Sequence, residues 1–309
     1  MTAQTLIRLG TRGSPLALAQ AHETQSRLAL THGLDPACIS IVIIKTTGDQ
    51  IQDRALALAG GKGLFTKELD AAMLEGAIDI AVHSAKDLPT RLPPGIVVAG
   101  YLPREDVRDA FISAKATSVA GLPYGATLGS ASLRRQAMML RLRPDLRPQL
   151  LRGNVETRLR KAETGEIDVT LLAIAGLKRL GLAHRATAVL EVADFLPAVG
   201  QGAIAITARP GDAQTLAALQ PILHDDTALA LAAERSFLDT LDGSCRMPIA
   251  GYGFLRDGRL EFHGAIYAID GSQAFAAKLS GGPGDGVAVG LAAGRDIRSR
   301  APASLFQIA

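Results

Sequence analysis

Short apolar runs alternate with longer segments of mixed polarity through the first two thirds of the chain. The runs are continuous in hydrophobicity and many are rich in β-branched residues, which predicts buried strands. In the N-terminal third they lie at residues 6–10, 40–46, 78–83 and 96–101. Further along the chain they lie at 126–130, 149–153, 169–176 and 203–209. This alternation predicts parallel sheets covered by helices, in two α/β units with a cleft between them.

Capping residues mark the ends of the predicted helices. Ser14 has the side chain of an N-cap and precedes Pro15, so a helix is expected to begin there. Gly33 is expected to end that helix. Asn154 is a suitable N-cap for a second helix, and another helix is expected to begin near Ala131.

The segment 62–76 has the periodicity of an amphipathic helix. Its apolar side chains recur at every fourth position, at Phe65, Leu69 and Met73. Its charged side chains are expected on the outer face, at Lys67, Glu68, Asp70 and Glu75.

The pattern changes near residue 223. A helix is predicted over 228–241, and two alternating stretches follow it as an antiparallel pair with a turn at 256–258. The glycine-rich stretch 280–286 is predicted as a loop. The last part of the chain is therefore expected to form a small α+β domain.

Length and composition are those of an ordinary globular protein. The 309 residues suggest two or three domains, and the net charge is only +3. No apolar run approaches the roughly 18 residues that span a bilayer, and no secretory signal is recognised at the N-terminus. Two cysteines cannot build a disulfide framework, and no Cys/His cluster suggests a metal, so a protein of the reducing cytosol is expected. Aromatic residues make up 4%, which argues against a base-stacking nucleic-acid surface.

Basic residues are concentrated between positions 134 and 161, where only Asp145 and Glu156 are acidic. Such a stretch in a nearly neutral protein suggests a local anionic ligand. For any one of these arginines, a solvated helix face is the simpler interpretation.

The two cysteines lie in different surroundings. Cys38 opens an apolar run and is expected to be a small buried apolar group. Cys245 lies in the turn-forming sequence DGSCRMP, beside Arg246, which would favour the thiolate. Cys245 is thus a candidate for a reactive or modified thiol, although an ordinary loop cysteine fits the same pattern.

Polar motifs follow several of the predicted strands. The stretch 11–17 joins a strand to a helix N-terminus, a place that binds anions. The stretch 60–69 lacks the P-loop pattern, so nucleotide binding is not expected there. Residues 83–89 follow a buried strand, so they should lie at a carboxyl end, where α/β sheets bind ligands. The adjacent arginines within 129–136 are expected to meet an anion, with a solvated pair as the alternative.

Five motifs in this order and spacing resemble the porphobilinogen deaminase (hydroxymethylbilane synthase) family, over about residues 6–255: HSAKDLP, GSASLRRQ, LRGNVETRL, VGQGAIAI and DGSCRMP. The resemblance implies a cytoplasmic, monomeric transferase of tetrapyrrole (haem and chlorophyll) biosynthesis, with no nucleic-acid or membrane partner. Such enzymes join four porphobilinogen units, each with loss of ammonia, into linear hydroxymethylbilane. A dipyrromethane cofactor, held on one cysteine by a thioether, primes the reaction, and Cys245 occupies that place.

The fold implied by the resemblance has two periplasmic-binding-protein-like α/β domains around a cleft and a small C-terminal α+β domain. Domain 1 is expected to comprise residues 1–102 with 203–222 and to carry the catalytic aspartate. Domain 2, 103–202, would be rich in substrate-binding arginines. Domain 3, 223–309, would carry the cofactor cysteine.

The resemblance also implies the residues of the site. Asp87 matches the catalytic aspartate, which stabilises the positive charge of the azafulvene left by loss of ammonia and of the coupled pyrroles, and Lys86 is expected to keep it ionised. The other cofactor-binding positions are Ser84, Ser132, Arg134, Arg135 and Arg158. The substrate-binding positions are Arg12, Ser14, Lys62, Phe65, Ser130, Arg152, Arg179 and Gln201. No metal is implied.

Some positions depart from the family pattern. Leu58 stands where many relatives carry a lysine, which leaves one cation fewer in the loop over the cleft. Ser244 replaces a second glycine before the cysteine. Residues 256–309 carry little resemblance and are assigned no function.

Three other functions fit parts of the sequence. A two-lobed binding protein for an anionic small molecule fits the two α/β units, and a nucleic-acid-binding protein could use the basic stretch. A cysteine hydrolase would need a histidine near Cys245, with His83, His224 and His263 available.

Overall fold

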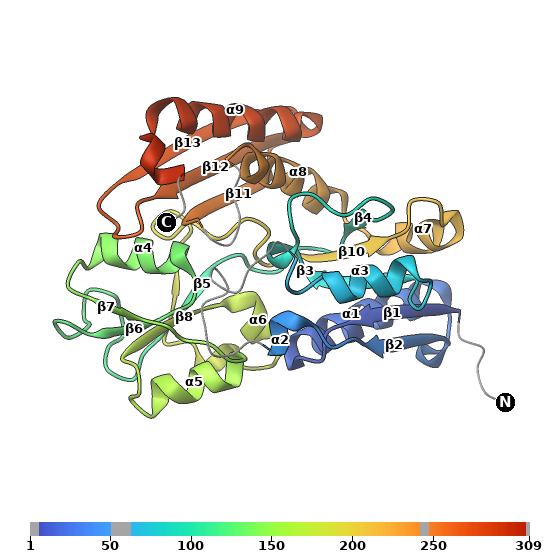
Figure 1. The fold of residues 1–309 in the computed structure, drawn as a ribbon, viewed down its shortest axis with the longest axis horizontal. Helices are drawn as coiled ribbons and strands as arrows, with labels where there is room; N and C mark the ends of the chain where they lie inside the picture. The colour runs from blue at the N-terminus through green and yellow to red at the C-terminus, as the bar shows by residue number, and fades with distance from the viewer. Residues whose placement is uncertain (1–5, 51–62, 242–246, 307–309) are drawn as a thin grey trace. The chain divides into compact units, whose positions relative to one another are not determined.

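A computed structural model describes residues 6–50, 63–241 and 247–306 (Figure 1). The predictions for Leu58, Lys62, Ser244 and Cys245 lie outside these residues. The described chain divides into two compact units. The first takes its residues from 1–51, 61–105 and 203–228, and the second from 106–202 and 229–309.

The first unit contains a five-stranded sheet in the order β2-β1-β3-β10-β4. Its strands are β1 (Ile7–Thr11), β2 (Ile39–Ile43), β3 (Ile80–Ser84), β4 (Val97–Tyr101) and β10 (Ile204–Ala208). β1 is parallel to β2 and β3, whereas β10 is antiparallel to β3 and β4. The expected all-parallel sheet is therefore wrong. β10 joins this sheet after the long excursion of the chain through residues 106–202, so no βαβ crossover dictates its direction.

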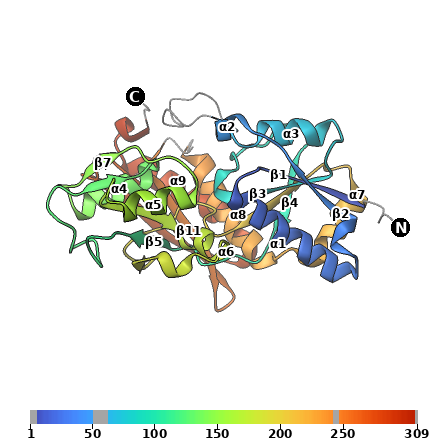
Figure 2. The ribbon, with the colours of Figure 1, turned by 90° about the horizontal axis from the view of Figure 1, so that it is seen from below.

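Helices cover both faces of this sheet. They are α1 (Pro15–His32), α2 (Thr47–Gln50), α3 (Lys67–Leu74) and α7 (Ala213–Leu219). Figure 2 shows α1 and α3 on opposite faces. The prediction for α1 is confirmed, because the Ser14 side chain caps its N-terminus and Gly33 adopts the left-handed conformation at its end.

Other expectations for this unit are wrong as well. The helix predicted over 62–76 is shorter, and Phe65 precedes it. Asp70 is buried rather than on the outer face, and this burial raises the pKa of its carboxyl group. The run at 40–46 is not fully buried, because β2 lies at the sheet edge and Ile43 is 57% exposed. A continuous apolar run does not distinguish an edge strand from a central one.

The second unit contains another five-stranded sheet, in the order β7-β6-β8-β5-β9. Its strands are β5 (Asp109–Ile112), β6 (Thr127–Gly129), β7 (Arg147–Gln149), β8 (Val169–Ala173) and β9 (Ala188–Leu190). Its helices are α4 (Leu133–Leu142), α5 (Val155–Glu163) and α6 (Ile174–Arg179). β6 is parallel to β7 and β8, and β5 is antiparallel to β8 and β9, so this sheet is mixed as well. The N-cap predicted at Asn154 is confirmed, whereas β5 and β9 were not predicted.

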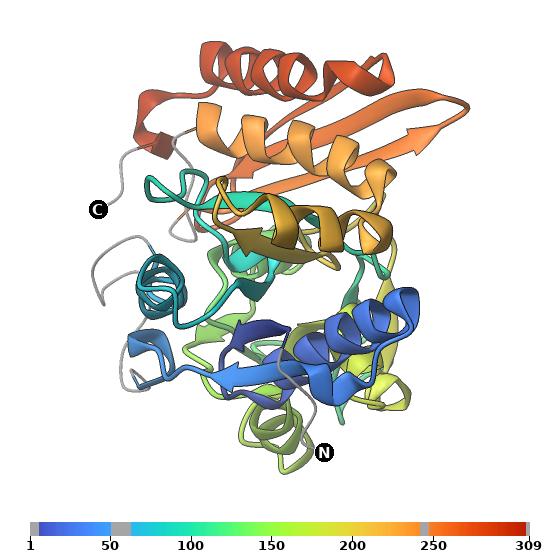
Figure 3. The ribbon, with the colours of Figure 1, turned by 90° about the vertical axis from the view of Figure 1, so that its right-hand side faces the viewer.

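The C-terminal part of the chain forms a three-stranded antiparallel sheet. Its strands are β11 (Ile249–Arg256), β12 (Arg259–Tyr267) and β13 (Ala274–Gly281), and its helices are α8 (Asp225–Thr240) and α9 (Gly286–Arg300). Figure 3 shows the two helices side by side along the sheet. The predicted hairpin is confirmed, with Asp257 and Gly258 at positive φ in a two-residue turn. The loop predicted over 280–286 is shorter, because β13 continues to Gly281 and α9 begins at Gly286.

Short 3-10 segments complete the described secondary structure, at Pro36–Cys38, Ala85–Asp87, Ala183–Arg185, Gln220–Ile222, Pro283–Asp285 and Ala303–Phe306. Cys38 ends the first of them and is only half-buried, so the expectation of a buried strand cysteine is wrong. None of the helices in the described ranges is long and apolar enough to cross a membrane. The described residues form a mixed α/β protein with two five-stranded sheets and a smaller C-terminal domain.

Candidate active site

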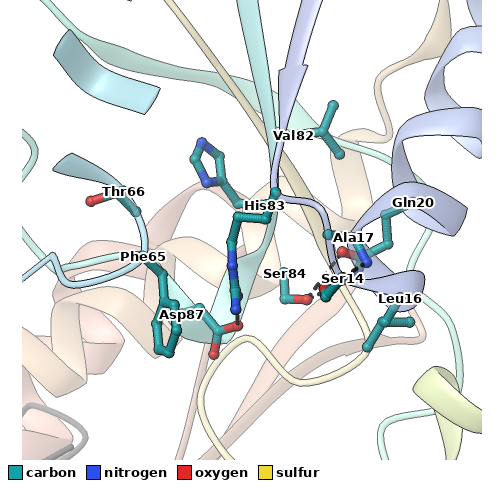
Figure 4. A pocket seen from close by; sticks show the side chains of 11 residues that line it. Ser14, Leu16, Ala17, Gln20, Phe65, Thr66, Val82, His83, Ser84 and Asp87 are labelled. Carbon is teal, nitrogen blue, oxygen red and sulfur yellow. Dashed lines mark hydrogen bonds and ion pairs between the residues drawn. The ribbon is translucent and has the colours of Figure 1, made fainter. Parts of the chain in front are cut away.

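A pocket lies at the carboxyl ends of β1 and β3 in the first unit (Figure 4). Because these strands are parallel neighbours, the segments that follow them meet at the same edge of the sheet. The lining residues come from the loop after β1, the first turns of α1, the segment before α3 and the end of β3: Arg12, Ser14, Leu16, Ala17, Gln20, Phe65, Thr66, Val82, His83, Ser84 and Asp87. The expectation that the HSAKDLP motif lies at a carboxyl end is confirmed.

Asp87 is held at this edge by the 3-10 turn that follows β3. Its Oδ2 lies 4.0 Å from Nη1 of Arg12, and the two side chains are 34% and 20% exposed. The Arg12 guanidinium also lies over the Phe65 ring, 4.0 Å from its centroid. Figure 4 shows Asp87 and Phe65 on the same side of the pocket. At this separation the ion pair is weak, so the carboxylate is oriented by a cation without being neutralised in a close contact.

Gln20 is a pocket residue that sequence reasoning missed. Its Nε2 donates to Oγ of Ser84 at 2.9 Å, and the Ser84 hydroxyl lies 3.1 Å from its Oε1. Gln20 is 3% exposed and lies on the buried face of α1 with Ala17, Ala21 and Thr24. A large amide among small neighbours on a buried helix face was the available signal. The pair fixes the orientation of the Ser84 side chain beside Asp87.

His83 lies in the wall of the pocket as a neutral imidazole. It is 6% exposed, and its Nε2 lies 3.1 Å from Oγ1 of Thr207. Burial, with a smaller contribution from the charge of Arg12, lowers the pKa of His83 to about 4. Arg12 is therefore the cation that faces Asp87 from the loop after β1, and His83 adds no second charge near neutral pH.

The other predicted residues of the first unit have structural contacts too. The Ser14 hydroxyl accepts a hydrogen bond from the Ala17 amide at 3.3 Å, as the N-cap of α1. Lys86 lies in the same 3-10 turn as Asp87 and is half-buried. The contact between Asp87 and Arg12 was not predicted, because the two residues are 75 positions apart in the sequence.

Two predicted cofactor ligands, Arg134 and Arg135, form a buried cluster in the second unit. They lie in the first turn of α4 and are 4% and 7% exposed. Nη2 of Arg134 lies 2.7 Å from Oδ2 of Asp109, and Nη2 of Arg135 lies 2.6 Å from Oδ1. Burial alone would raise the pKa of Asp109, but the two guanidinium groups hold it at about 2. The alternative of a solvated pair is wrong, because the anion that these arginines meet is a carboxylate of the chain itself.

Arg134 is enclosed on several sides. Its Nη1 donates to the Leu196 carbonyl at 2.7 Å, and its guanidinium carbon lies 5.5 Å from the centroid of the Phe195 ring. Its Nε is buried without a hydrogen-bond partner. Most of the donor capacity of Arg134 is therefore committed within the second unit.

The remaining predicted residues of the second unit lie around α4, α5 and α6. Ser132 caps α4, and the buried Ser130 accepts a hydrogen bond from the Ser132 amide at 3.0 Å. Nε of Arg158 donates to the Gly153 carbonyl at 2.9 Å, and Nη2 of Arg179 donates to the Gly202 carbonyl at 3.2 Å. Arg152 is half-buried.

Gln201 lies where the chain leaves the second unit. It is 1% exposed, and its Nε2 donates to the Val107 carbonyl at 2.8 Å. Val107 is close to the point where the chain enters the same unit. The amide therefore ties the two crossing segments together.

The donor set of the pocket can be compared with possible cofactors. Across the part of the chain described here, no group of three or more His, Cys, Asp or Glu side chains could hold a metal ion. Arg12, Ser14 and Ser84 offer donors for carboxylates, and Asp87 offers an acceptor for a pyrrole N–H. These groups fit a small aromatic ligand that carries both N–H donors and carboxylate side chains, such as a pyrrole with acetate and propionate substituents.

Curated proteins similar to this chain are porphobilinogen deaminases. The enzyme of Nitrobacter winogradskyi is 55% identical over 303 residues, covering 98% of this chain and 96% of that protein. The enzyme of Paracoccus denitrificans is 52% identical, covering 98% and 97%. The chloroplastic enzyme of Oryza sativa subsp. japonica is 52% identical, covering 98% and 86%.

Solved structures offer more distant similarities. A putative methionine-binding lipoprotein from Bacillus subtilis is 14% identical with a TM-score of 0.43, covering 71% of this chain and 90% of that one. A periplasmic substrate-binding protein from Coxiella burnetii is 18% identical with a TM-score of 0.43, covering 74% and 97%. At these scores the similarity supports no inference about function.

Family models cover most of the sequence. The model described as "Porphobilinogen deaminase, dipyromethane cofactor binding domain" matches residues 7–217. The model described as "Porphobilinogen deaminase, C-terminal domain" matches residues 228–299. Together with relatives more than half identical over nearly the full length, these matches identify the family. The chain belongs to the porphobilinogen deaminase family.

Proposed function

We propose that Asp87, with Arg12 beside it, is the catalytic carboxylate with which this chain acts as a hydroxymethylbilane synthase. The enzyme joins porphobilinogen molecules, releases ammonia at each coupling, and yields a linear tetrapyrrole. The observation that supports the role of Asp87 is its position: a partly exposed carboxylate at the carboxyl end of β3, in a pocket, facing one arginine at 4.0 Å.

The chemistry calls for such a group. Loss of ammonia from porphobilinogen leaves a cationic methylene-pyrrole, and the positive charge extends to the ring nitrogen. An ionised carboxylate that is already oriented stabilises this charge as it develops. Asp87 can accept a hydrogen bond from a pyrrole N–H, whereas the neutral His83 cannot add a charge that would oppose the cation.

Arg12 is proposed to bind an acetate or propionate group of the substrate. A guanidinium presents two parallel N–H donors and matches a carboxylate in geometry. Because Arg12 also lies close to Asp87, one side chain would anchor the substrate and set its distance from the catalytic carboxylate. Ser84, oriented by Gln20, would supply a further donor.

The dipyrromethane cofactor of the family fits the polar groups of this pocket, and when bound it supplies the pyrrole carbon to which the first substrate is joined. We propose Cys245 as its covalent attachment point. The residues proposed to hold it are Ser84, Lys86, Asp87, Ser132, Arg134, Arg135 and Arg158. Arg134 and Arg135 would do so while they remain paired with Asp109. The residues proposed to bind substrate are Arg12, Ser14, Lys62, Phe65, Ser130, Arg152, Arg179 and Gln201.

Several coarser features belong to the same proposal. The domains would comprise residues 1–102 with 203–222, residues 103–202 and residues 223–309. The enzyme would act as a monomer in the cytoplasm, without nucleic-acid or membrane partners. A two-lobed binding protein is not favoured, because the family models and the similar curated proteins are deaminases.

The test is the variant Asp87→Asn, which keeps the shape of the side chain and removes its charge. Porphobilinogen consumption should fall by about 10²-fold or more, as after loss of one preorganised electrostatic group. Asp257→Asn is the matched control, since Asp257 lies in the hairpin turn between β11 and β12. Near-normal turnover by Asp87→Asn would exclude the catalytic role.

The cofactor attachment is tested separately by intact mass. The wild-type chain should carry the added mass of one dipyrrole, located on the peptide that contains Cys245. Cys245→Ser should show the mass of the bare chain. An added mass on another residue would contradict the assignment of Cys245 without affecting that of Asp87.

A further inference from the structure

The ring of Phe65 is packed tightly against the short helix α2. A Cβ atom placed on Gly48 would lie 2.3 Å from Cε1 and 2.4 Å from Cδ1 of this ring, and 2.8 Å from the Leu64 carbonyl oxygen. Carbon atoms that are not bonded to each other do not approach so closely, so one of the two groups would have to move. A residue with a side chain at position 48 would therefore displace the Phe65 ring or α2.

Hydrogen bonds resist a shift of α2. The Gly48 amide donates to the Leu64 carbonyl at 2.8 Å, and the Thr47 amide donates to Oε1 of Glu68 at 3.0 Å. Partial burial would raise the pKa of Glu68, but the hydrogen bonds from the Thr47 hydroxyl and amide hold it below its ordinary value. These hydrogen bonds hold α2 to Leu64 and Glu68, which lie on either side of Phe65 in the sequence. The Phe65 ring is therefore more easily displaced than α2.

The Phe65 ring in turn contacts Arg12. The guanidinium carbon lies 4.0 Å from the ring centroid, within the range of a cation–π interaction. The same guanidinium lies 4.0 Å from the Asp87 carboxylate. Gly48, Phe65, Arg12 and Asp87 thus form a series of consecutive contacts that ends at the proposed catalytic group.

We propose that Gly48 is a positioning residue, whose lack of a side chain lets Phe65 hold the Arg12 guanidinium beside Asp87. The proposal rests on the proposed function, because it assigns Gly48 an effect on the anchoring of substrate by Arg12. Gly48 touches neither substrate nor reacting atoms. Its effect comes from the position that it allows the Phe65 ring to adopt.

The kinetic test compares Gly48→Ala with Gly211→Ala. Gly211 lies in the same unit with no atom within 4 Å of an added Cβ, so its variant should match the wild type. Gly48→Ala should lower kcat/KM for porphobilinogen by about 10-fold, the size expected for a displaced cation–π contact. In an Arg12→Gln background, Gly48→Ala should have no further effect, since Gly48 acts through Arg12.

A spectroscopic test needs no turnover. A guanidinium over an aromatic ring should show an Nε–H proton resonance shifted upfield by the ring current. This resonance should be absent in Arg12→Gln, return to the ordinary range in Phe65→Leu, move in Gly48→Ala and stay in place in Gly211→Ala. In thermal unfolding, Gly48→Ala should lose no more stability than the displacement of the Phe65 ring accounts for.

The possible outcomes separate this inference from the proposed function. If Asp87→Asn is inactive but Gly48→Ala leaves both kcat/KM and the Arg12 resonance unchanged, the positioning role is wrong and the catalytic role stands. If Gly48→Ala and Arg12→Gln have independent, multiplying effects on kcat/KM, Gly48 does not act through Arg12. If Asp87→Asn is fully active, the proposed function fails first.

Discussion

The two five-stranded sheets have the same layout, and each presents an aspartate to arginines, but the two carboxylates are held very differently. Asp87 in the first unit is 34% exposed and lies 4.0 Å from Arg12. Asp109 in the second unit is fully buried and lies within 2.7 Å of both Arg134 and Arg135. Both contacts pair unlike charges, yet only Asp87 keeps a surface on which a ligand could bind.

The difference separates a group available for catalysis from a group that holds the fold. A buried carboxylate paired with two guanidinium groups has its charge more than compensated before any ligand arrives. A carboxylate at a pocket wall, oriented by a distant cation, still gains from a new positive charge beside it. If this distinction is correct, substitution of Asp109 should mainly lower stability, and substitution of Asp87 should mainly lower turnover.

The largest effect on stability is expected for Asp109→Asn. The substitution leaves two buried guanidinium groups without their counter-charge, and breaking such a cluster costs about 3–5 kcal/mol. The loss should appear as a lower urea midpoint, with faster amide hydrogen exchange in β5 and α4. Asp87→Asn should leave both measurements close to those of the wild type. Equal stability of the two variants would contradict the comparison.

The stability that the Asp109 cluster contributes should also depend on pH. The pKa of Asp109 is lowered from 3.8 to about 2 in the folded chain. The cluster therefore contributes its stability fully above the unfolded value, and this contribution is lost as the pH falls from about 4 to about 2. It amounts to about 2 kcal/mol. Urea titrations at several pH values should show the wild type converging on Asp109→Asn across this window, and parallel curves would argue against it.

The smallest effect is expected for the coupling between Arg12 and Asp87. A half-exposed pair at 4.0 Å should contribute less than about 1 kcal/mol to the free energy of unfolding. A double-mutant cycle with Arg12→Gln and Asp87→Asn measures this coupling, and 1 M salt should reduce it further. A coupling as large as that of the Asp109 cluster would remove the distinction between the two sites.

Much of the local structure could be predicted from the sequence. Ser14 and Gly33 bound α1 as expected, Asn154 caps α5, and the turn at Asp257 and Gly258 joins β11 to β12. These features depend on hydrogen bonds and dihedral angles within a few neighbouring residues. Such interactions involve residues that are close together in the sequence, so they can be recognised without the rest of the fold.

The family resemblance also pointed to two residues that line the same pocket. Asp87 and Arg12 were expected in a site, and the structure brings both into one pocket. Their mutual contact and the part played by Gln20 were not predicted. Both depend on β1 and β3 becoming parallel neighbours, which is a property of the sheet and not of either strand.

The arginines at the strand–helix junctions show what the sequence could not determine. Arg12 and Arg134 each lie at the junction of a strand and a helix, and neither position reveals whether its charge will face a pocket or a buried acid. The outcome for Arg134 depends on Asp109, in a strand that the hydrophobic pattern did not reveal. The sequence by itself determined the caps, the hairpin and the family motifs, because these act over short distances along the chain. Only the tertiary structure decided which carboxylate is buried and which stays open, because burial depends on segments that meet across the sheet.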